Sequence, residues 1–196
     1  TNKDQLIQWM SDAVVSKLKR SGGSDRNTAK QLEVNRLSTS DNRLREVSLF
    51  VRQGEIVGIF GLAGAGRTEL LEAIYGLNPV KSGSFFIDGQ PVQIRSPRQA
   101  LDHGIVLIPE ERKRDALIMN MSIRENMTLP IINRFRRALR MDYRQERQDV
   151  KHWMDSMKIK ASGQEQAVSQ LSGGNQQKVV FAKALLLNAR IFLCRS

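Results

Sequence analysis

Cysteine and histidine are scarce in this sequence, which holds one cysteine and two histidines among 196 residues. The lone Cys194 excludes a disulfide within the chain, so nothing indicates an oxidising compartment. His103 and His152 lie far apart and have no acidic cluster of ligand spacing beside them, which argues against a structural zinc site.

Long apolar runs are also missing. No stretch approaches the roughly 18 uninterrupted apolar residues that a membrane-spanning helix needs. The polar start, Thr1 to Asp4, lacks the pattern of a signal peptide. With 40% hydrophobic residues the chain can nevertheless bury one ordinary core. We therefore expect a soluble protein with one domain and a short appendage.

Aromatic residues make up only 6% of the chain, whereas 31 basic residues against 20 acidic ones give a formal charge of +11. Such a charge suits nucleic acid, an anionic membrane surface or a phosphorylated ligand. The basic residues gather in clusters such as Arg112 to Arg114, without the interleaved aromatic side chains that stack on bases. This pattern favours solvated helix faces over a nucleic-acid groove.

The first 30 residues differ in character from the rest. Apolar residues recur at helical spacing over 4–19, which predicts an amphipathic helix, and the Ser- and Gly-rich stretch 21–25 is typical of a linker. We interpret 1–30 as the tail of a preceding domain with its tether. Residues 31–196 then form the main domain.

Strand and helix patterns alternate in the main domain. Strands are predicted at 31–37, 45–51, 55–60, 84–88, 104–108 and 191–194, and helices at 68–75, 142–158 and 175–187. A capping box at Ser122 to Glu125 begins a further helix. We expect an α/β core that carries a helical subdomain at about 120–175.

A glycine-rich segment follows the predicted strand 55–60 and opens the predicted helix 68–75. The segment is Gly61-Leu62-Ala63-Gly64-Ala65-Gly66-Arg67-Thr68. This spacing is typical of a loop whose backbone N–H groups cradle phosphates beside the positive end of a helix. Thr68 can place its hydroxyl on Mg²⁺ between the phosphates, whereas Arg67 stands where lysine is usual. The alternative is a tight glycine turn without a ligand.

A second segment with the chemistry of an anion site begins the predicted helix 175–187. It consists of Ser172, Gly173, Gly174 and Asn175. A hydroxyl and glycine backbone N–H groups at a helix start again suit an anion. The alternative is an ordinary helix N-cap that glycine makes more flexible, without a ligand. The position of this segment just before a helix and a final strand, in a chain with a phosphate-type loop, favours the ligand.

Together these residues resemble the ABC transporter ATPases, whose Walker A loop matches 61–68 and whose signature motif matches Leu171–Asn175. Asn175 stands where the wider family more often has glutamine. A finer resemblance is to the second ATP-binding domain of the tandem ATPases that drive bacterial monosaccharide import, in the ribose, xylose, galactose and arabinose class. It rests on the segments 61–70, 109–115, 121–127 and 171–178. The resemblance runs from about residue 31 to the end.

The resemblance implies an α/β P-loop NTPase fold of the ABC type, with ATP and Mg²⁺ as cofactors. The residues expected to hold the phosphates in cis are Gly61, Gly64, Ala65, Gly66, Arg67 and Thr68, with Thr68 also the metal ligand. The residues expected to contact nucleotide held by a second nucleotide-binding domain are Ser172, Gly173, Gly174 and Asn175. Glu110 stands near where the family has the glutamine that senses Mg²⁺ and water, or else it is a charged residue of a surface loop.

The resemblance also implies partners. The helical subdomain would touch membrane permease subunits, and a periplasmic sugar-binding protein would act indirectly, with this chain peripheral at the cytoplasmic face of the inner membrane. No nucleic-acid partner is expected. The identity of the sugar does not follow, because in such systems selectivity resides in the binding protein and the membrane subunits.

The family continues its last strand into an Asp that holds Mg²⁺ through water and a Glu that activates the attacking water. Here Arg195 and Ser196 follow that strand, so no catalytic residue is assigned. We expect a C-terminally incomplete domain that is inactive alone and poorly soluble. Two alternatives stay open: a non-hydrolysing binding or regulatory fragment, which the absent carboxylates favour, and a soluble ABC-type ATPase working on nucleic acid, which the charge permits.

Overall fold

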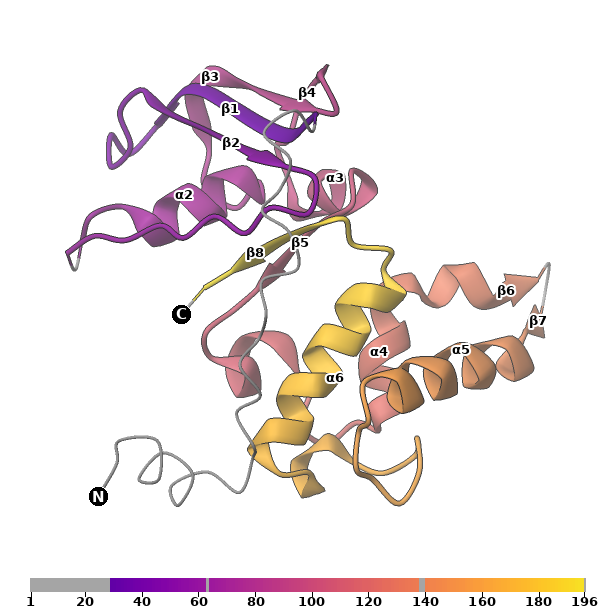
Figure 1. The fold of residues 1–196 in the computed structure, drawn as a ribbon. Helices are drawn as coiled ribbons and strands as arrows, with labels where there is room; N and C mark the ends of the chain where they lie inside the picture. The colour runs from indigo at the N-terminus through magenta and orange to yellow at the C-terminus, as the bar shows by residue number, and fades with distance from the viewer. Residues whose placement is uncertain (1–28, 63, 138–139, 196) are drawn as a thin grey trace, which may run out of the picture.

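The computed structural model describes residues 29–62, 64–137 and 140–195. A β-rich part and a mainly helical part lie one above the other, and a short parallel strand pair joins them (Figure 1). The predicted helix at 4–19 and the predicted linker at 21–25 lie outside the described residues.

The β-rich part is a four-stranded antiparallel sheet of order β2-β1-β3-β4. Its strands are β1 (Lys30–Thr39), β2 (Val47–Arg52), β3 (Val80–Ile87) and β4 (Gln90–Val92). The sequence predicted the first three and missed β4. Asp88 and Gly89, with φ of 50° and 76°, make the two-residue turn that joins β3 to β4.

The parallel pair consists of β5 (Ile105–Ile108) and β8 (Ile191–Cys194), with Ile105 opposite Ile191 and Ile108 opposite Cys194. Both were predicted as apolar runs, as parallel strands buried on two faces usually are. The helix α3 (Pro97–Asp102), which the sequence did not predict, leads into β5 and begins with Ser96 as its N-cap.

The helical part follows β5. Its elements are η1 (Arg112–Ala116), α4 (Ile123–Thr128), η2 (Leu129–Phe135), β6 (Arg136–Arg137), β7 (Arg140–Met141), α5 (Tyr143–Ser156), η3 (Val168–Gln170) and α6 (Gly173–Leu186). The predicted capping box is present: Ser122 Oγ accepts from Glu125 N, and Glu125 Oε2 accepts from Ser122 N at 2.8 Å. Across the three ranges that the structure describes, no helix combines the length and apolar character needed to cross a membrane.

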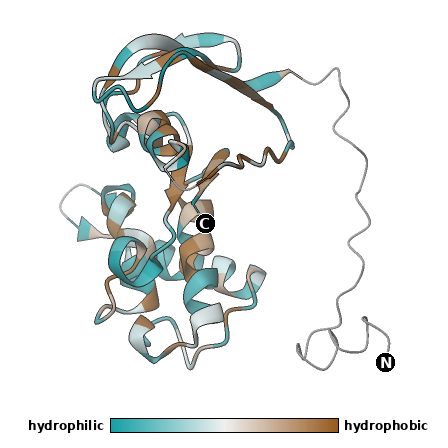
Figure 2. Ribbon diagram, turned by 90° about the vertical axis from the view of Figure 1, so that its left-hand side faces the viewer, coloured by the Kyte–Doolittle hydropathy of each residue, from teal (hydrophilic) through white to brown (hydrophobic). Residues whose placement is uncertain are grey.

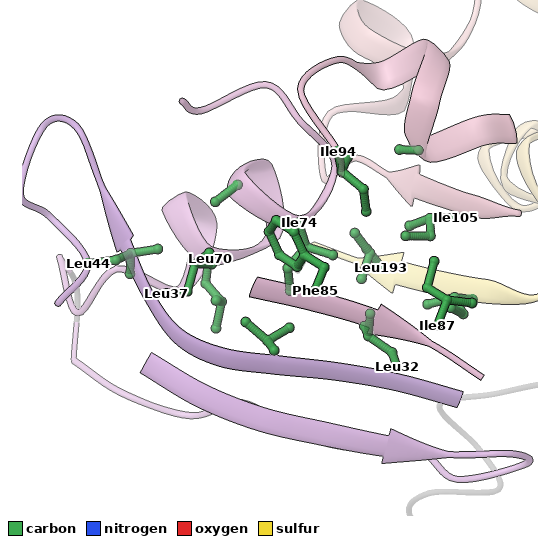
Figure 3. Close-up of a cluster of buried hydrophobic side chains, with 14 residues drawn as sticks. Leu32, Leu37, Leu44, Leu70, Ile74, Phe85, Ile87, Ile94, Ile105 and Leu193 are labelled. Carbon is green, nitrogen blue, oxygen red and sulfur yellow. The ribbon is translucent and has the colours of Figure 1, made fainter. Parts of the chain in front are cut away.

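Two hydrophobic clusters pack against opposite faces of the parallel strand pair. The first lies between the four-stranded sheet and the helix α2 (Arg67–Ile74), and Figure 3 shows Phe85, Ile74 and Leu193 within it. The second packs α4, α5 and α6 together. Because successive side chains of a strand point to opposite faces, Ile105 enters the first cluster and Val106 the second.

The predicted strand at 55–60 is wrong. The segment runs as an irregular trace from β2 to α2 (Figures 1 and 2). Its apolar side chains are open to solvent, with Ile56 98% and Phe60 92% exposed. A turn ends β2 first, since Glu55 N donates to Arg52 O at 3.1 Å. A strand needs a neighbour to accept its backbone hydrogen bonds, and no described residue pairs with this segment.

Candidate functional site

The glycine-rich loop turns directly into α2. Gly64 and Gly66 have φ of +80° and +82°, in the left-handed region that favours glycine. Gly66 is buried and is the N-cap of α2, and a Cβ added there would lie 3.0 Å from Leu44 Cδ2. The glycines are therefore needed to bring the chain round onto the start of the helix.

The start of α2 offers hydrogen-bond donors. The backbone N–H groups of Arg67 and Thr68 have no acceptor in the described part of the chain, as is usual for the first turn of a helix. Thr68 is half-buried and its hydroxyl has no partner among the same residues, while Arg67 is exposed. These groups, the positive end of α2 and one free hydroxyl fit the phosphates and a single ligand of Mg²⁺. Ala63 lies outside the described residues.

Glu69, one residue further along, does not add a free carboxylate to this site. Its side chain accepts from Arg43 Nη1 at 2.9 Å. A hydrogen bond from its own backbone N–H, and then the Arg43 guanidinium, hold the pKa of the Glu69 carboxyl below its usual value. The start of α2 therefore presents backbone donors, with the nearby Glu69 carboxylate paired to Arg43.

The second predicted segment caps α6. Ser172, its N-cap, and the first two helical residues, Gly173 and Gly174, are exposed. Asn175 is held in place by two hydrogen bonds: its Nδ2 donates to Ser172 Oγ at 3.0 Å, and its Oδ1 accepts from Lys160 N at 2.9 Å. The serine and the two glycines thus form an open helix start, with the asparagine bracing it against the loop after α5.

Gln176 ties the start of α6 to the backbone that precedes it. It is buried, and its Nε2 donates to the backbone oxygens of Val168 and Leu171, each at 3.1 Å. The sequence gave no functional reason to single it out. A polar residue at an otherwise apolar helical position was the available signal, since buried amides are retained where they satisfy backbone groups.

Glu110 lies in the loop after β5 and is 59% exposed. Its Oε2 is 4.0 Å from Arg195 Nε, and Arg195 Nη1 is 3.4 Å from Glu72 Oε1 on α2. Arg195, which follows β8, thus connects the loop carrying Glu110 to the helix that starts at the glycine-rich loop. The sequence did not predict this bridging contact.

The two helix starts do not meet within the chain. The glycine-rich loop lies beside the four-stranded sheet, whereas α6 begins at the end of the helical part farthest from that sheet, and both views agree (Figures 1 and 2). Through Arg195 the structure brings Glu110 toward Glu72 on α2 but leaves Ser172 to Asn175 apart from the glycine-rich loop. One chain thus presents two separate, glycine-containing helix starts.

Comparison with known sequences identifies the family. The ABC transporter family model matches residues 44–194. The ribose import ATP-binding protein RbsA of Geobacillus kaustophilus is 44% identical over 197 residues, covering 98% of this chain and 39% of that protein. The xylose import ATP-binding protein XylG of Escherichia coli K12 is 40% identical, covering 77% of this chain and 30% of that protein. The chain therefore spans less than half the length of these relatives.

Comparison with solved structures supports the fold. The chain is similar to cbiO1 of Clostridium perfringens, part of an ABC transporter complex, with a TM-score of 0.68 at 18% identity over 85% of this chain and 65% of that one. It is equally similar, at a TM-score of 0.68 and 20% identity, to an ATP-binding cassette in its ADP conformation, over 84% and 68% of the two chains. The chain belongs to the ABC transporter family, and its fold is the α/β P-loop fold of that family's ATP-binding domains.

Proposed function

We propose that this chain is the ATP-binding part of a monosaccharide importer and that it contributes two half-sites for nucleotide. The observation that carries this proposal is the separation of its two exposed, glycine-lined helix starts, at α2 and at α6. The two starts lie at different ends of the chain (Figures 1 and 2), so each is proposed to act with a second domain rather than with the other on one nucleoside triphosphate. The relatives, which are ribose and xylose import proteins, support a pentose or a related sugar as cargo.

In the cis half-site, Gly61, Gly64, Ala65 and Gly66 carry the backbone around the phosphates. The N–H groups at the start of α2 donate to phosphate oxygens, and Thr68 supplies a hydroxyl ligand to Mg²⁺. Arg67 adds a planar cation whose reach differs from that of lysine. When bound, Mg²⁺ neutralises phosphate charge. Glu110, close to Arg195 and so to α2, is proposed to lie beside the phosphates.

In the trans half-site, Ser172, Gly173, Gly174 and Asn175 contact nucleotide held by a partner nucleotide-binding domain. The proposed assembly also includes membrane permease subunits and, through them, a periplasmic sugar-binding protein. It places this chain at the cytoplasmic face of the membrane. The apolar segment 55–60, which contains few charged residues, takes no part in the proposed nucleotide binding.

Calorimetric titration with Mg-ATP tests the cis half-site. Thr68→Ala should weaken binding about tenfold, because it removes a hydroxyl that acts on charged groups. Ser82→Ala is the matched control, since Ser82 is an exposed hydroxyl on β3. Equal affinity of the Thr68→Ala protein and the unchanged chain would remove the Thr68 hydroxyl from the site.

Growth of the source organism tests the cargo. With Thr68→Ala introduced into this coding region, growth on one of ribose, xylose, galactose or arabinose should slow, while growth on glycerol stays normal. Normal growth on all four sugars would contradict a role in their import.

A further inference from the structure

Arg112 lies across the start of α6. A Cβ added to Gly173 would be 2.8 Å from Arg112 Nη2 and 3.8 Å from its Cζ. The guanidinium therefore occupies the space where a side chain of residue 173 would begin. Since Cα–Cβ bonds in a helix tilt toward its N-terminus, this space lies at the open end of α6, next to the exposed Ser172 and Gly174.

The Arg112 guanidinium has no anionic partner in residues 29–62, 64–137 and 140–195. No carboxylate there lies within 4.0 Å of it, and its buried Nε has no hydrogen-bond acceptor. Arg114, two residues on, is by contrast paired with Asp115 at 2.7 Å. A cation beside the positive end of a helix is electrostatically unfavourable unless an anion is bound between them.

The turn that carries Arg112 is fixed to α6 at a second point. Leu117 N donates to Arg112 O at 2.9 Å, which closes η1, and Lys183 Nζ on α6 donates to Ala116 O at 3.1 Å. Burial lowers the pKa of the Lys183 ammonium, in keeping with its place between the two elements. Arg112 thus reaches the start of α6 from an anchored turn.

The N–H groups of Gly173, Gly174 and Asn175 have no acceptor among the described residues. Three backbone donors and one guanidinium therefore face the same region, with the Ser172 hydroxyl at its edge. Guanidinium groups bind phosphate oxygens through two parallel hydrogen bonds. The combination matches a phosphate group bearing several charges.

We propose that Arg112 is the cation of the half-site at α6 and binds the terminal phosphate of a nucleotide held by the partner domain. This inference rests on the proposed function, and it adds a residue that lies outside the Ser172–Asn175 segment. It also explains why residue 173 is glycine, because a larger side chain would displace the guanidinium.

Nuclear magnetic resonance on the ¹⁵N-labelled chain tests this, with inorganic tripolyphosphate as the probe and millimolar titrations. The amides of Gly173, Gly174 and Asn175 report the α6 half-site, and those of Gly64 to Thr68 report the other. Arg112→Gln should weaken binding at the α6 amides about tenfold or more, as expected for losing a charge-assisted hydrogen bond. Arg112→Lys, which keeps the charge, should retain most of the affinity.

Lys113→Gln is the matched control, because Lys113 is exposed on the same turn and carries the same charge. It should leave both sets of amides with unchanged affinities. The proposal is overturned if the α6 amides do not respond in the unchanged chain, if Arg112→Gln binds equally well there, or if Lys113→Gln loses as much. Failure of the proposed function is distinct: the amides of Gly64 to Thr68 would then not respond in any of the proteins.

Discussion

Replacing Arg124 with methionine should destabilise the protein by about 3–5 kcal/mol, because the change leaves a buried carboxylate without its cation. Arg124 Nη1 lies 3.1 Å from both carboxylate oxygens of Glu146, whose side chain is 0% exposed. Among the described residues, the only other hydrogen-bond partner of that carboxylate is Thr128 Oγ1, which donates to Glu146 Oε1 at 2.7 Å. The same guanidinium also holds Glu165 at 2.9 Å.

The expected loss is large compared with the whole stability of a domain, which is about 5–15 kcal/mol. Arg147→Met is the matched control. Arg147 approaches Glu165 at 3.9 Å and is 60% exposed, so its pair is a surface one and should contribute less than about 1 kcal/mol. Replacing both members of the buried pair, as Arg124→Met with Glu146→Leu, should recover much of the stability, since no buried charge is left unpaired.

Urea unfolding followed by circular dichroism at 222 nm measures these differences through the midpoint and slope. The single Arg124→Met protein should unfold at a clearly lower urea concentration than either the Arg147→Met protein or the double variant. If Arg124→Met and Arg147→Met shift the midpoint equally, the buried pair does not hold α4 against α5 and the reasoning is refuted.

Three further predictions concern backbone, pH and surface. Gly66→Ala should cost about 1–3 kcal/mol because of its positive φ and the nearby Leu44, whereas Gly174→Ala, with nothing within 4 Å of the added Cβ, should leave the urea midpoint nearly unchanged. The Ser122 backbone N–H, and then its hydroxyl, lower the pKa of the Glu125 carboxyl from 4.5. The stability that this lowered pKa contributes is present above about pH 4.5 and is lost as the pH falls through the lowered value. Glu125→Gln should therefore flatten the pH dependence of the thermal midpoint, measured from pH 6 to 3. Phe60→Ser should raise the soluble fraction after centrifugation because this ring is 92% exposed, and an unchanged soluble fraction would contradict an aggregation role for the 55–60 trace.

Local signals in the sequence predicted local structure well. The capping box at Ser122 is fixed by residues three apart, so its hydrogen bonds could be predicted without knowledge of the fold. The apolar runs of β5 and β8 were equally clear. The helix start at α2 was predicted one residue late, at Thr68, where it begins at Arg67.

The failures involve partners distant in sequence. The 55–60 run has the composition of a strand, but a strand also needs a neighbour, and composition cannot supply one. β4 was missed because three residues carry little periodicity, and Pro91 within it lowers the strand signal. Both are tertiary effects that a pattern within one segment does not contain.

In the candidate site, too, local features could be predicted from the sequence and contacts between distant segments could not. The sequence pointed to both helix starts, through the glycine spacing before α2, where Gly64 and Gly66 have positive φ, and through the Ser-Gly-Gly at the start of α6. The contacts of Arg195 with Glu72 and of Arg112 with Gly173 join segments far apart in the chain, at separations that no motif encodes. The sequence placed Arg112 in a basic cluster and in the segment 109–115 that carries the resemblance, but gave it no role in a site.

The measurement that tests the central claim most directly asks whether the two half-sites act in different molecules. A ¹⁵N-labelled Thr68→Ala chain is mixed with unlabelled, unchanged chain and ATP with Mn²⁺ in place of Mg²⁺, so that the paramagnetic ion broadens nearby amides. The account predicts broadening at the labelled Gly173, Gly174 and Asn175 and none at the labelled Gly64 to Arg67. Sharp resonances at all of these positions, while the unlabelled chain binds the nucleotide, would contradict it.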